Sequence, residues 1–201
     1  MCRGVWGACG SGAQVHGLIL AGGQSMRMRS AAWPNADKGL MTWQGHQLVA
    51  RARRYMRSQG IPAILISANR HLLDYARHGP VLTDPSGLPN GGPLAGVLAG
   101  LLHAADGWLF VAPVDVPELP VDLCQRLAAE ASPQHPAYAR TPAGPHPLCL
   151  LVHASQIGSL ETFLHAGQRR VQGWLASVQA RVVDFQPAIE WRNLNTPADW
   201  A

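Results

Sequence analysis

Short apolar runs alternate with longer amphipathic stretches along the first 130 residues. Each run has too few residues for a helix and is bounded by Gly, Pro or Asp, which is the pattern of a buried strand. The runs of this kind cover 15–20, 63–67, 81–83 and 108–114. We therefore predict four buried strands in this part of the chain.

The stretches between these runs carry apolar side chains at helical spacing. In 48–59, apolar positions recur three or four residues apart, and arginines occupy the other faces. Proline suits the first turn of a helix, which supports helices over 93–103 and, after Pro120, over 121–130. Strands that alternate with helices are typical of βαβ units, so we expect an α/β fold with a mostly parallel sheet.

The second half of the chain has a more mixed pattern. Two further strands are predicted over 148–152 and 180–185. Two further helices are predicted over 156–166 and 171–178. Near the end, Asn195-Thr196-Pro197 is typical of a helix start, with Thr as the N-cap and Pro at the first helical position. A chain of 201 residues corresponds to about one domain, and we expect 14–201 to form it.

Composition narrows the class of protein. Hydrophobic residues make up 47% of the chain and no run of about 18 apolar residues occurs, which excludes disorder of the whole chain and a transmembrane helix. The four cysteines include no CxxC pair, so a zinc ribbon has almost no support. Residues 1–13 lack the apolar segment of a signal peptide. We expect these residues to form a poorly ordered tail, and the protein to be cytoplasmic with reduced thiols.

The net charge of +4 is too small to indicate a nucleic-acid partner. The seven Trp residues are scattered and do not interleave with a basic run, which also disfavours nucleic acid. Seven of the 16 basic residues lie between Arg27 and Arg57. They form either a solvated helix face with a basic loop or an anion-binding site, and the charge pattern leaves both readings open.

Glycine and polar residues follow the predicted strands directly. Gly22 and Gly23 follow the first strand, and Ser67 to Asn69 lie at the end of the second. Asp84 and Asp115 follow the third and the fourth. In an open α/β sheet, ligands bind beyond the carboxyl ends of the strands. These four places therefore form the candidate ligand site.

On the residues alone, each member of this site has two readings. A glycine pair either forms a tight turn or lets a ligand approach the backbone N–H groups. Asp115 either caps a turn or helps to bind Mg²⁺, which proteins usually hold with one or two carboxylates plus substrate phosphates. Asp84 either forms a turn or accepts hydrogen bonds from a base or a ribose. The chain has neither a P-loop nor a G-x-G-x-x-G fingerprint after the first strand.

Two cations accompany a long loop over 24–37. Arg27 lies within it and Lys38 directly follows it. Loops of this length are often functional, and the two cations suggest a clamp on a polyphosphate, although each alone is typical of a solvated surface charge. Further along, His146 precedes a strand and Arg169-Arg170 opens a helix. These are either a structural histidine with surface arginines or a second anion site.

With these residues in hand, the chain resembles the molybdenum cofactor guanylyltransferases, which join a GMP moiety to molybdopterin. The opening motif of that family reads L-A-G-G-x-S-x-R-M-G-x-D-K, and the similarity covers nearly everything from Val15 onward. The matching segments are Leu20-Ala21-Gly22-Gly23, Ser25, Arg27-Met28, Asp37-Lys38-Gly39-Leu40, Ala68-Asn69-Arg70-His71, Gly92-Pro93-Leu94-Ala95-Gly96, Asp115, His146-Pro147, Arg169-Arg170-Val171 and Asn195-Thr196-Pro197. The resemblance implies a three-layer, Rossmann-like nucleotidyltransferase fold.

The resemblance also implies residue roles. The nucleotide would be bound by Leu20, Ala21, Gly22, Gly23, Lys38, Ser67, Asp84 and Asp115. Among these, Lys38 would contact the phosphates together with Arg27, Asp84 would recognise the nucleoside and Asp115 would bind Mg²⁺. His146, Arg169 and Arg170, in the second half of the domain, would face the pterin.

The implied reaction is Mg²⁺-dependent transfer of GMP from GTP to molybdopterin, with pyrophosphate as the second product. GTP and molybdopterin would be the small-molecule partners, and molybdenum cofactor biosynthesis proteins or target molybdoenzymes the expected protein partners. Nucleic acid and membranes are not expected partners.

Two alternatives stay open. The related cytidylyltransferases tend to read L-A-A-G, whereas Gly22 leaves space for a purine. A non-catalytic carrier of the nucleotide or the cofactor is supported by Arg29, which stands where the family has Gly, and by the longer loop over 30–36. Ser67 stands where the family often has Asn, which affects base selectivity.

Overall fold

Seven strands form one central sheet in the order β5-β4-β1-β6-β8-β7-β9. The computed structural model describes residues 14–22, 37–88, 91–186, 191, 193–194 and 197–200, and the account below concerns these residues. The strands are β1 (Val15–Leu20), β4 (Ala63–Ser67), β5 (Val81–Leu82), β6 (Trp108–Pro113), β7 (Ala137–Thr141), β8 (Gly144–His153) and β9 (Arg181–Asp184). A separate two-stranded hairpin pairs β2 (Thr42–Trp43) with β3 (His46–Gln47).

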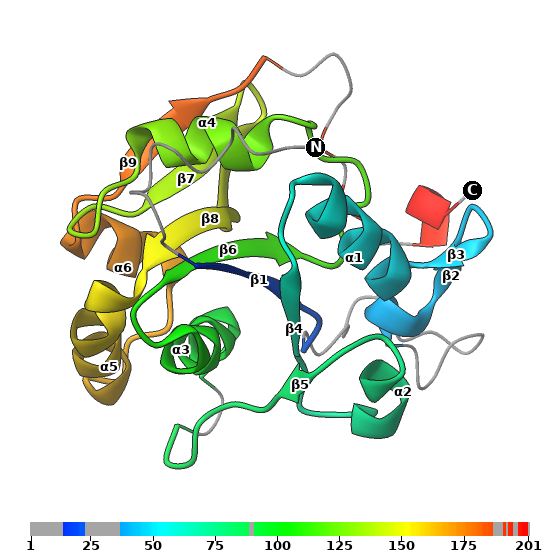
Figure 1. Cartoon of the computed structure of the whole chain (residues 1–201), viewed down its shortest axis with the longest axis horizontal. Coiled ribbons are helices and arrows are strands. Elements are labelled where there is room, and N and C mark those ends of the chain that lie inside the picture. The colour runs from blue at the N-terminus through cyan, green and yellow to red at the C-terminus, as the bar shows by residue number, and fades with distance from the viewer. Residues whose placement is uncertain are drawn as a thin grey trace.

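Most strand pairs are parallel, as the sequence predicts. β1 lies between β4 and β6 and is parallel to both, and β5 and β9 also pair in parallel with their neighbours. β8 alone runs against its neighbours β6 and β7. The carboxyl ends of β1, β4, β5 and β6 therefore meet at one edge, and β8 begins at that edge (Figure 1).

Helices cover both faces of the sheet, so the domain has the three predicted layers (Figure 1). One face packs against α1 (Leu48–Ser58) and α4 (Leu123–Glu130). The other packs against α3 (Pro93–Ala104), α5 (Ile157–His165) and α6 (Val171–Ser177). Neighbouring residues of β1 show the alternation of a strand, because Ile19 belongs to the first cluster and Leu18 to the second.

The predicted elements are found with small differences at their ends. The strands predicted over 15–20 and 63–67 have those bounds, whereas the strand predicted over 148–152 already begins at Gly144. The predicted terminal helix is a single 3-10 turn, η5 (Pro197–Trp200), and its predicted cap at Asn195-Thr196 lies outside the described residues, as does the expected tail 1–13.

The elements that were not predicted include the hairpin of β2 and β3, the 3-10 helix η3 (Lys38–Leu40), the strand β7 and one short helix. β7 alternates buried Ala137 and Ala139 with Tyr138 and Arg140, a polar pattern that resembles a surface loop. The short helix α2 (Leu72–Ala76) has too few residues to show a helical period. No helix of the described part of the chain is long and apolar enough to cross a membrane.

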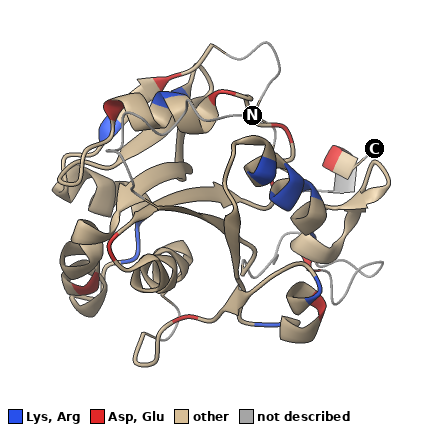
Figure 2. Ribbon diagram, in the orientation of Figure 1, with Lys and Arg blue, Asp and Glu red and all other residues tan. Residues whose placement is uncertain are grey.

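The basic cluster between Arg27 and Arg57 divides into separate groups. Its arginines from Arg51 onward lie on α1, where Arg54 and Arg57 are exposed and Arg51 stacks over the Trp43 ring at 4.5 Å (Figure 2). Arg27 and Arg29 lie outside the described residues. For α1, the structure therefore supports the reading of a solvated helix face.

Glycine lets α3 lie close to the sheet. A Cβ on Gly100 would be 2.8 Å from Cδ2 of Leu109 and 3.0 Å from Cδ2 of Leu18, and both leucines are fully buried. Gly158, near the start of α5, has open space at the same position. A methyl group would therefore meet buried side chains at Gly100 and open space at Gly158.

We expect Gly100→Ala and Gly158→Ala to change stability in opposite directions. Gly158→Ala should raise the free energy of unfolding by about 0.5 kcal/mol, because alanine restricts the unfolded chain more than glycine does. Gly100→Ala should lower it by about 1 kcal/mol, because overpacking outweighs that gain. Urea unfolding followed by circular dichroism measures both, and equal stabilisation by the two substitutions would contradict the close packing of α3.

Candidate active site

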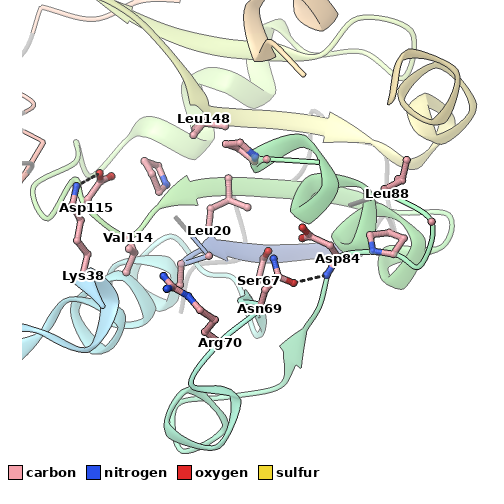
Figure 3. A pocket seen from close by; sticks show the side chains of 17 residues that line it. Leu20, Lys38, Ser67, Asn69, Arg70, Asp84, Leu88, Val114, Asp115 and Leu148 are labelled. Atoms are coloured by element: carbon pink, nitrogen blue, oxygen red, sulfur yellow. Dashed lines mark hydrogen bonds and ion pairs between the residues drawn. The ribbon is translucent and has the colours of Figure 1, made fainter. Parts of the chain in front are cut away.

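A cavity of about 1100 Å³ opens at the edge where β1, β4, β5 and β6 end (Figure 3). It is lined by Leu20, Ala21, Gly22, Lys38, Ser67, Asn69, Arg70, Asp84, Pro85, Gly87, Leu88, Gly92, Pro93, Pro113, Val114, Asp115 and Leu148. All four predicted places at strand ends contribute to this one cavity. Gly23 and Arg27, also predicted for the site, lie outside the described residues.

A lysine and a carboxylate meet at one end of the cavity. Lys38 Nζ lies 3.2 Å from Oδ2 of Asp115, and both side chains are mostly buried, with 14% and 23% of their surface exposed (Figure 3). Lys38 begins the short 3-10 helix η3 (Lys38–Leu40), whereas Asp115 follows β6. Of the described members of the basic cluster, Lys38 is the one that lines the cavity.

Backbone hydrogen bonds fix the loop that carries Asp115. The N–H of Val114 donates to the carbonyl of Leu20 at 3.1 Å, which joins the end of β6 to the end of β1. The N–H of Leu194 donates to the carbonyl of Asp115 at 2.9 Å. The C-terminal segment thus holds the backbone of Asp115 while its carboxylate stays turned toward Lys38 in the cavity.

A second carboxylate lies beyond β5. The backbone N–H of Asp84 donates to Oδ1 of Asn69 at 2.9 Å, so the amide of Asn69 holds the start of the loop that follows β5 (Figure 3). Burial raises the pKa of the Asp84 carboxyl above its ordinary value, and the Asn69 side chain partly offsets this rise. Arg70, an exposed cation that follows Asn69, also lines the cavity.

The glycine turn after β1 packs against the end of β4. The N–H of Ala21 donates to the carbonyl of Ser67 at 2.9 Å. A Cβ on Gly22 would lie 3.7 Å from Nδ2 of Asn69 and from the backbone of Ser67 and Ala68, which is ordinary contact. The protein itself would therefore accommodate a methyl group at Gly22, and any selective effect of that methyl must come from what occupies the cavity.

The donor set suits a divalent cation that shares its ligands with a substrate. Asp115 supplies one carboxylate at the cavity wall. Among the residues that the structure describes, no three His, Cys, Asp or Glu side chains gather to form a metal cage. Magnesium is commonly held by one or two carboxylates while water and substrate phosphates fill its other positions. Asp115 fits such an ion, and a fully protein-ligated metal has no support among these residues.

The residues predicted for the pterin do not line this cavity. His146, on β8, hydrogen-bonds Oγ1 of Thr141 at 2.9 Å and packs against Trp191, with ring centroids 4.6 Å apart; burial lowers the pKa of its imidazole. Arg169 donates through Nη1 to the carbonyls of Leu164 and Gln168. Their role in pterin binding, like that of Arg170, stays a prediction.

Sequence reasoning missed several residues of the cavity. Arg70 belongs to a segment quoted for the resemblance but was assigned no role, whereas Asn69 was expected at the site as part of 67–69 and does line the cavity. Leu88, Val114 and Leu148 are apolar wall residues that no chemical motif marks. The signal for Arg70 was its position shortly after a strand, which is the rule that selected Ser67 to Asn69.

Comparisons with known proteins agree with this geometry. A family model described as a MobA-like NTP transferase domain matches residues 17–182. A protein of Cupriavidus metallidurans named molybdenum cofactor guanylyltransferase is 38% identical over 192 residues, which cover 90% of each chain. The protein of the same name from Serratia proteamaculans is 35% identical over 189 residues, which cover 92% of each chain.

Solved structures share the fold at lower identity. The molybdopterin-guanine dinucleotide biosynthesis protein A of Archaeoglobus fulgidus superimposes with a TM-score of 0.69 at 19% identity and covers 92% of this chain and 94% of its own. A nucleotidyl transferase of Methanothermobacter gives a TM-score of 0.72 at 18% identity, with 93% and 94% covered.

We expect the carboxyls of Asp84 and Asp184 to titrate on opposite sides of an ordinary aspartate. Burial raises the pKa of Asp84, whereas the hydrogen bond and charge of Arg140 lower the pKa of the exposed Asp184. A pH titration of the carboxyl ¹³C signals measures both pKa values. Asn69→Ala should raise the pKa of Asp84 further and leave that of Asp184 unchanged.

The sign for stability follows from the Asp84 shift. Its folded-state pKa lies above that of the unfolded chain, so the folded protein takes up this proton first as the pH falls. The cost of burying the charge therefore applies at neutral pH and is relieved as the pH falls through the folded-state pKa. An Asp84 carboxyl that titrates below an ordinary aspartate would overturn this assignment.

Proposed function

The chain belongs to the MobA-like NTP transferase family and to its molybdenum cofactor guanylyltransferases, and from this premise we propose that it transfers GMP from GTP to molybdopterin. The protein is a nucleotidyltransferase. The observation that carries the fuller proposal is the Lys38–Asp115 pair in the cavity beyond β1 and β6. A cation for phosphates and a carboxylate for a metal ion stand there beside a glycine turn that leaves room for a nucleotide.

In the proposed reaction, the terminal phosphate of molybdopterin attacks the α-phosphorus of GTP. A bond forms between that phosphate oxygen and the α-phosphorus, and the bond from the α-phosphorus to the β-bridging oxygen breaks, so that pyrophosphate leaves. The attacking oxygen is already an anion, so no side chain has to remove a proton from it. Catalysis then depends on positioning and on charge neutralisation, which needs no Ser-His-Asp or Cys-His constellation.

Lys38 and Asp115 have complementary roles in this proposal. Lys38 neutralises the negative charge that builds on the departing pyrophosphate. Asp115 would hold Mg²⁺, which supplies Lewis-acid stabilisation of phosphate oxygens when it is bound. The two side chains neutralise each other across 3.2 Å. When the substrate binds, its phosphates can replace Asp115 as the partner of Lys38, and a cation can replace Lys38 as the partner of Asp115. Neither charge is then left uncompensated in the cavity.

The nucleoside would lie toward β4 and β5. Asp84 can accept hydrogen bonds from base or ribose donors, and Asn69 fixes the backbone at Asp84. Ser67 and the backbone at Ala21 and Gly22 form the adjacent wall. Ser67 presents its hydroxyl toward Gly96 of α3, where a Cβ on Gly96 would overlap it.

The proposal extends to the second substrate and to partners. Residues 14–201 would act as one domain whose C-terminal half binds molybdopterin with His146, Arg169 and Arg170. GTP and molybdopterin are the proposed small-molecule partners, and cofactor biosynthesis proteins or target molybdoenzymes the proposed protein partners. Cytoplasmic location stays a prediction. The names of the relatives favour neither the cytidylyltransferase alternative nor the carrier.

Calorimetric titration with GTP, CTP and ATP in the presence of Mg²⁺ tests this function. We expect GTP to bind best and Asp115→Ala to abolish the dependence on Mg²⁺. With molybdopterin added, Lys38→Ala and Asp115→Ala should each lower kcat by about 10² or more, the usual scale for loss of one electrostatic contact to a transition state. A preference for CTP would assign the chain to the cytidylyl reaction, and binding without transfer would support the carrier.

Gly22→Ala should alter the choice of base without altering the fold. The added methyl meets only ordinary contacts at 3.7 Å within the protein, so the midpoint of thermal unfolding should not fall. Because the methyl narrows the cavity beside Asn69, the ratio of kcat/KM for GTP to that for CTP should fall by about tenfold, the scale of one methyl group in a pocket. An unchanged ratio would remove Gly22 from base selection.

A further inference from the structure

A fully buried tyrosine connects α2 to the segment that carries Lys38. The hydroxyl of Tyr75 donates a hydrogen bond to Oδ1 of Asp37, the residue immediately before Lys38. Tyr75 has no exposed surface and Asp37 has 7%. Asp37 does not line the cavity, whereas Lys38 does. The two neighbouring side chains therefore point to different surroundings, one into the protein and one toward the ligand site.

The carboxylate of Asp37 organises the turn that contains Lys38. The same Oδ1 atom accepts a second hydrogen bond, from the N–H of Gly39 at 3.2 Å. One carboxylate oxygen thus binds both the Tyr75 hydroxyl and the Gly39 N–H. The ring of Tyr75 lies against Gly39, where a Cβ would overlap the phenol oxygen and stand 3.0 Å from Cε1. Residues 37 to 39 are thus held in place by one phenol, and the backbone of Lys38 lies between the two held residues.

A second contact joins the same two segments. Gln47, at the end of β3, donates through Nε2 to the carbonyl of Leu40 at 3.0 Å. Its Oε1 lies 2.9 Å from Nε2 of His78, which follows α2. The carboxyl-terminal end of α2 is therefore fixed to η3 by two contacts, directly by Tyr75 on its last turn and through Gln47 by His78 beyond it.

The hydrogen bond between Tyr75 and Asp37 connects two segments that line different sides of the cavity. α2 begins two residues after Arg70, which lines the cavity on the side of Asn69 and Asp84. Lys38 lines it on the side of Asp115. The Tyr75–Asp37 hydrogen bond spans 38 residues of sequence and links these two walls through the protein interior. Burial also raises the pKa of the Tyr75 phenol far above neutrality, so it remains a donor at every pH at which the protein works.

We propose that Tyr75 is a positioning residue that sets the side chain of Lys38 in the active site through its hydrogen bond to Asp37. The inference rests on the proposed function in so far as Lys38 acts on the phosphates. Tyr75 itself touches no substrate. Removing its hydroxyl leaves a buried carboxylate with one donor fewer, and the turn over 37–39 shifts to recover hydration, which displaces Lys38 from Asp115 and from the phosphate position.

The chain offers a matched control in Tyr55. This tyrosine of α1 is also mostly buried, and its hydroxyl donates to the carbonyl of Pro120 at 2.7 Å. It makes no contact with η3 in the described hydrogen bonds, and burial likewise raises its pKa. Tyr55→Phe therefore loses one buried hydroxyl and its hydrogen bond, as Tyr75→Phe does, without disturbing Asp37.

A double-mutant cycle with Lys38 separates positioning from general stability. We expect Tyr75→Phe to lower kcat by about tenfold, the effect of a hydrogen bond to a charged group, in a protein that still has Lys38. In the Lys38→Ala background the same substitution should change kcat by less than about twofold, because the residue that it positions is gone. Tyr55→Phe should leave kcat unchanged in both backgrounds.

The same cycle is measured on binding of tripolyphosphate with Mg²⁺, which needs no transfer activity. There Tyr75→Phe should weaken binding by about tenfold with Lys38 present and by less than about twofold without it. Non-additive binding in a protein that transfers no GMP would refute the proposed function and support the role of Tyr75. Transfer activity with additive effects of Tyr75→Phe and Lys38→Ala would support the function and overturn the positioning role.

Substitutions at Asp37 keep the inference testable if Tyr75→Phe does not fold. Asp37→Asn retains an oxygen that accepts from Tyr75 and Gly39, whereas Asp37→Ala removes it. We expect Asp37→Asn to weaken tripolyphosphate binding several-fold less than Asp37→Ala does. Equal losses for the two variants would show that the charge of Asp37 matters rather than the hydrogen bonds, and would overturn the proposal.

Discussion

The ion pair between Lys38 and Asp115 is the constraint on which the candidate site depends. Both side chains are mostly buried, and a buried charge without a partner is costly enough to prevent that arrangement. The pair requires η3 and the end of β6 to lie together although 77 residues separate them in sequence. Contacts outside the cavity therefore have to fix both segments. β6 is fixed by its pairing with β1, and η3 by its contacts with α2 and β3.

The sheet explains why much of this site is predictable from sequence. Continuous apolar runs such as 15–20 and 63–67 identify buried parallel strands, and the residues after such strands must meet at one edge. That rule brings together Gly22, Ser67, Asp84 and Asp115, which the structure places in one cavity. The rule needs only local sequence and the common direction of the strands. The predicted site therefore stays correct even when the predicted end of a strand is wrong by one or two residues.

What the sequence could not supply is pairing between distant side chains. Tyr75 lies in a helix too short to show a period, and its hydroxyl meets Asp37 because of how α2 packs on η3, which no local pattern encodes. The same holds for Asn69, whose amide supports the backbone of Asp84 across 15 residues. β7 was missed because its buried positions hold only small residues, Ala137, Ala139 and Thr141, so its strand character comes from its partners β8 and β9 rather than from large hydrophobic side chains.

The direction of β8 divides the domain into two halves that meet at the cavity. β1, β4, β5 and β6 all end at this edge, and the reversed β8 begins there, so Leu148 reaches the cavity wall while His146 packs on Trp191. The side that we propose for the nucleotide is thus built from the ends of parallel strands, and the other side from the beginning of one antiparallel strand. A reaction that joins two substrates needs adjacent sites with different chemistry. A single reversed strand beside β6 provides that difference next to Asp115, where the two substrates would have to meet.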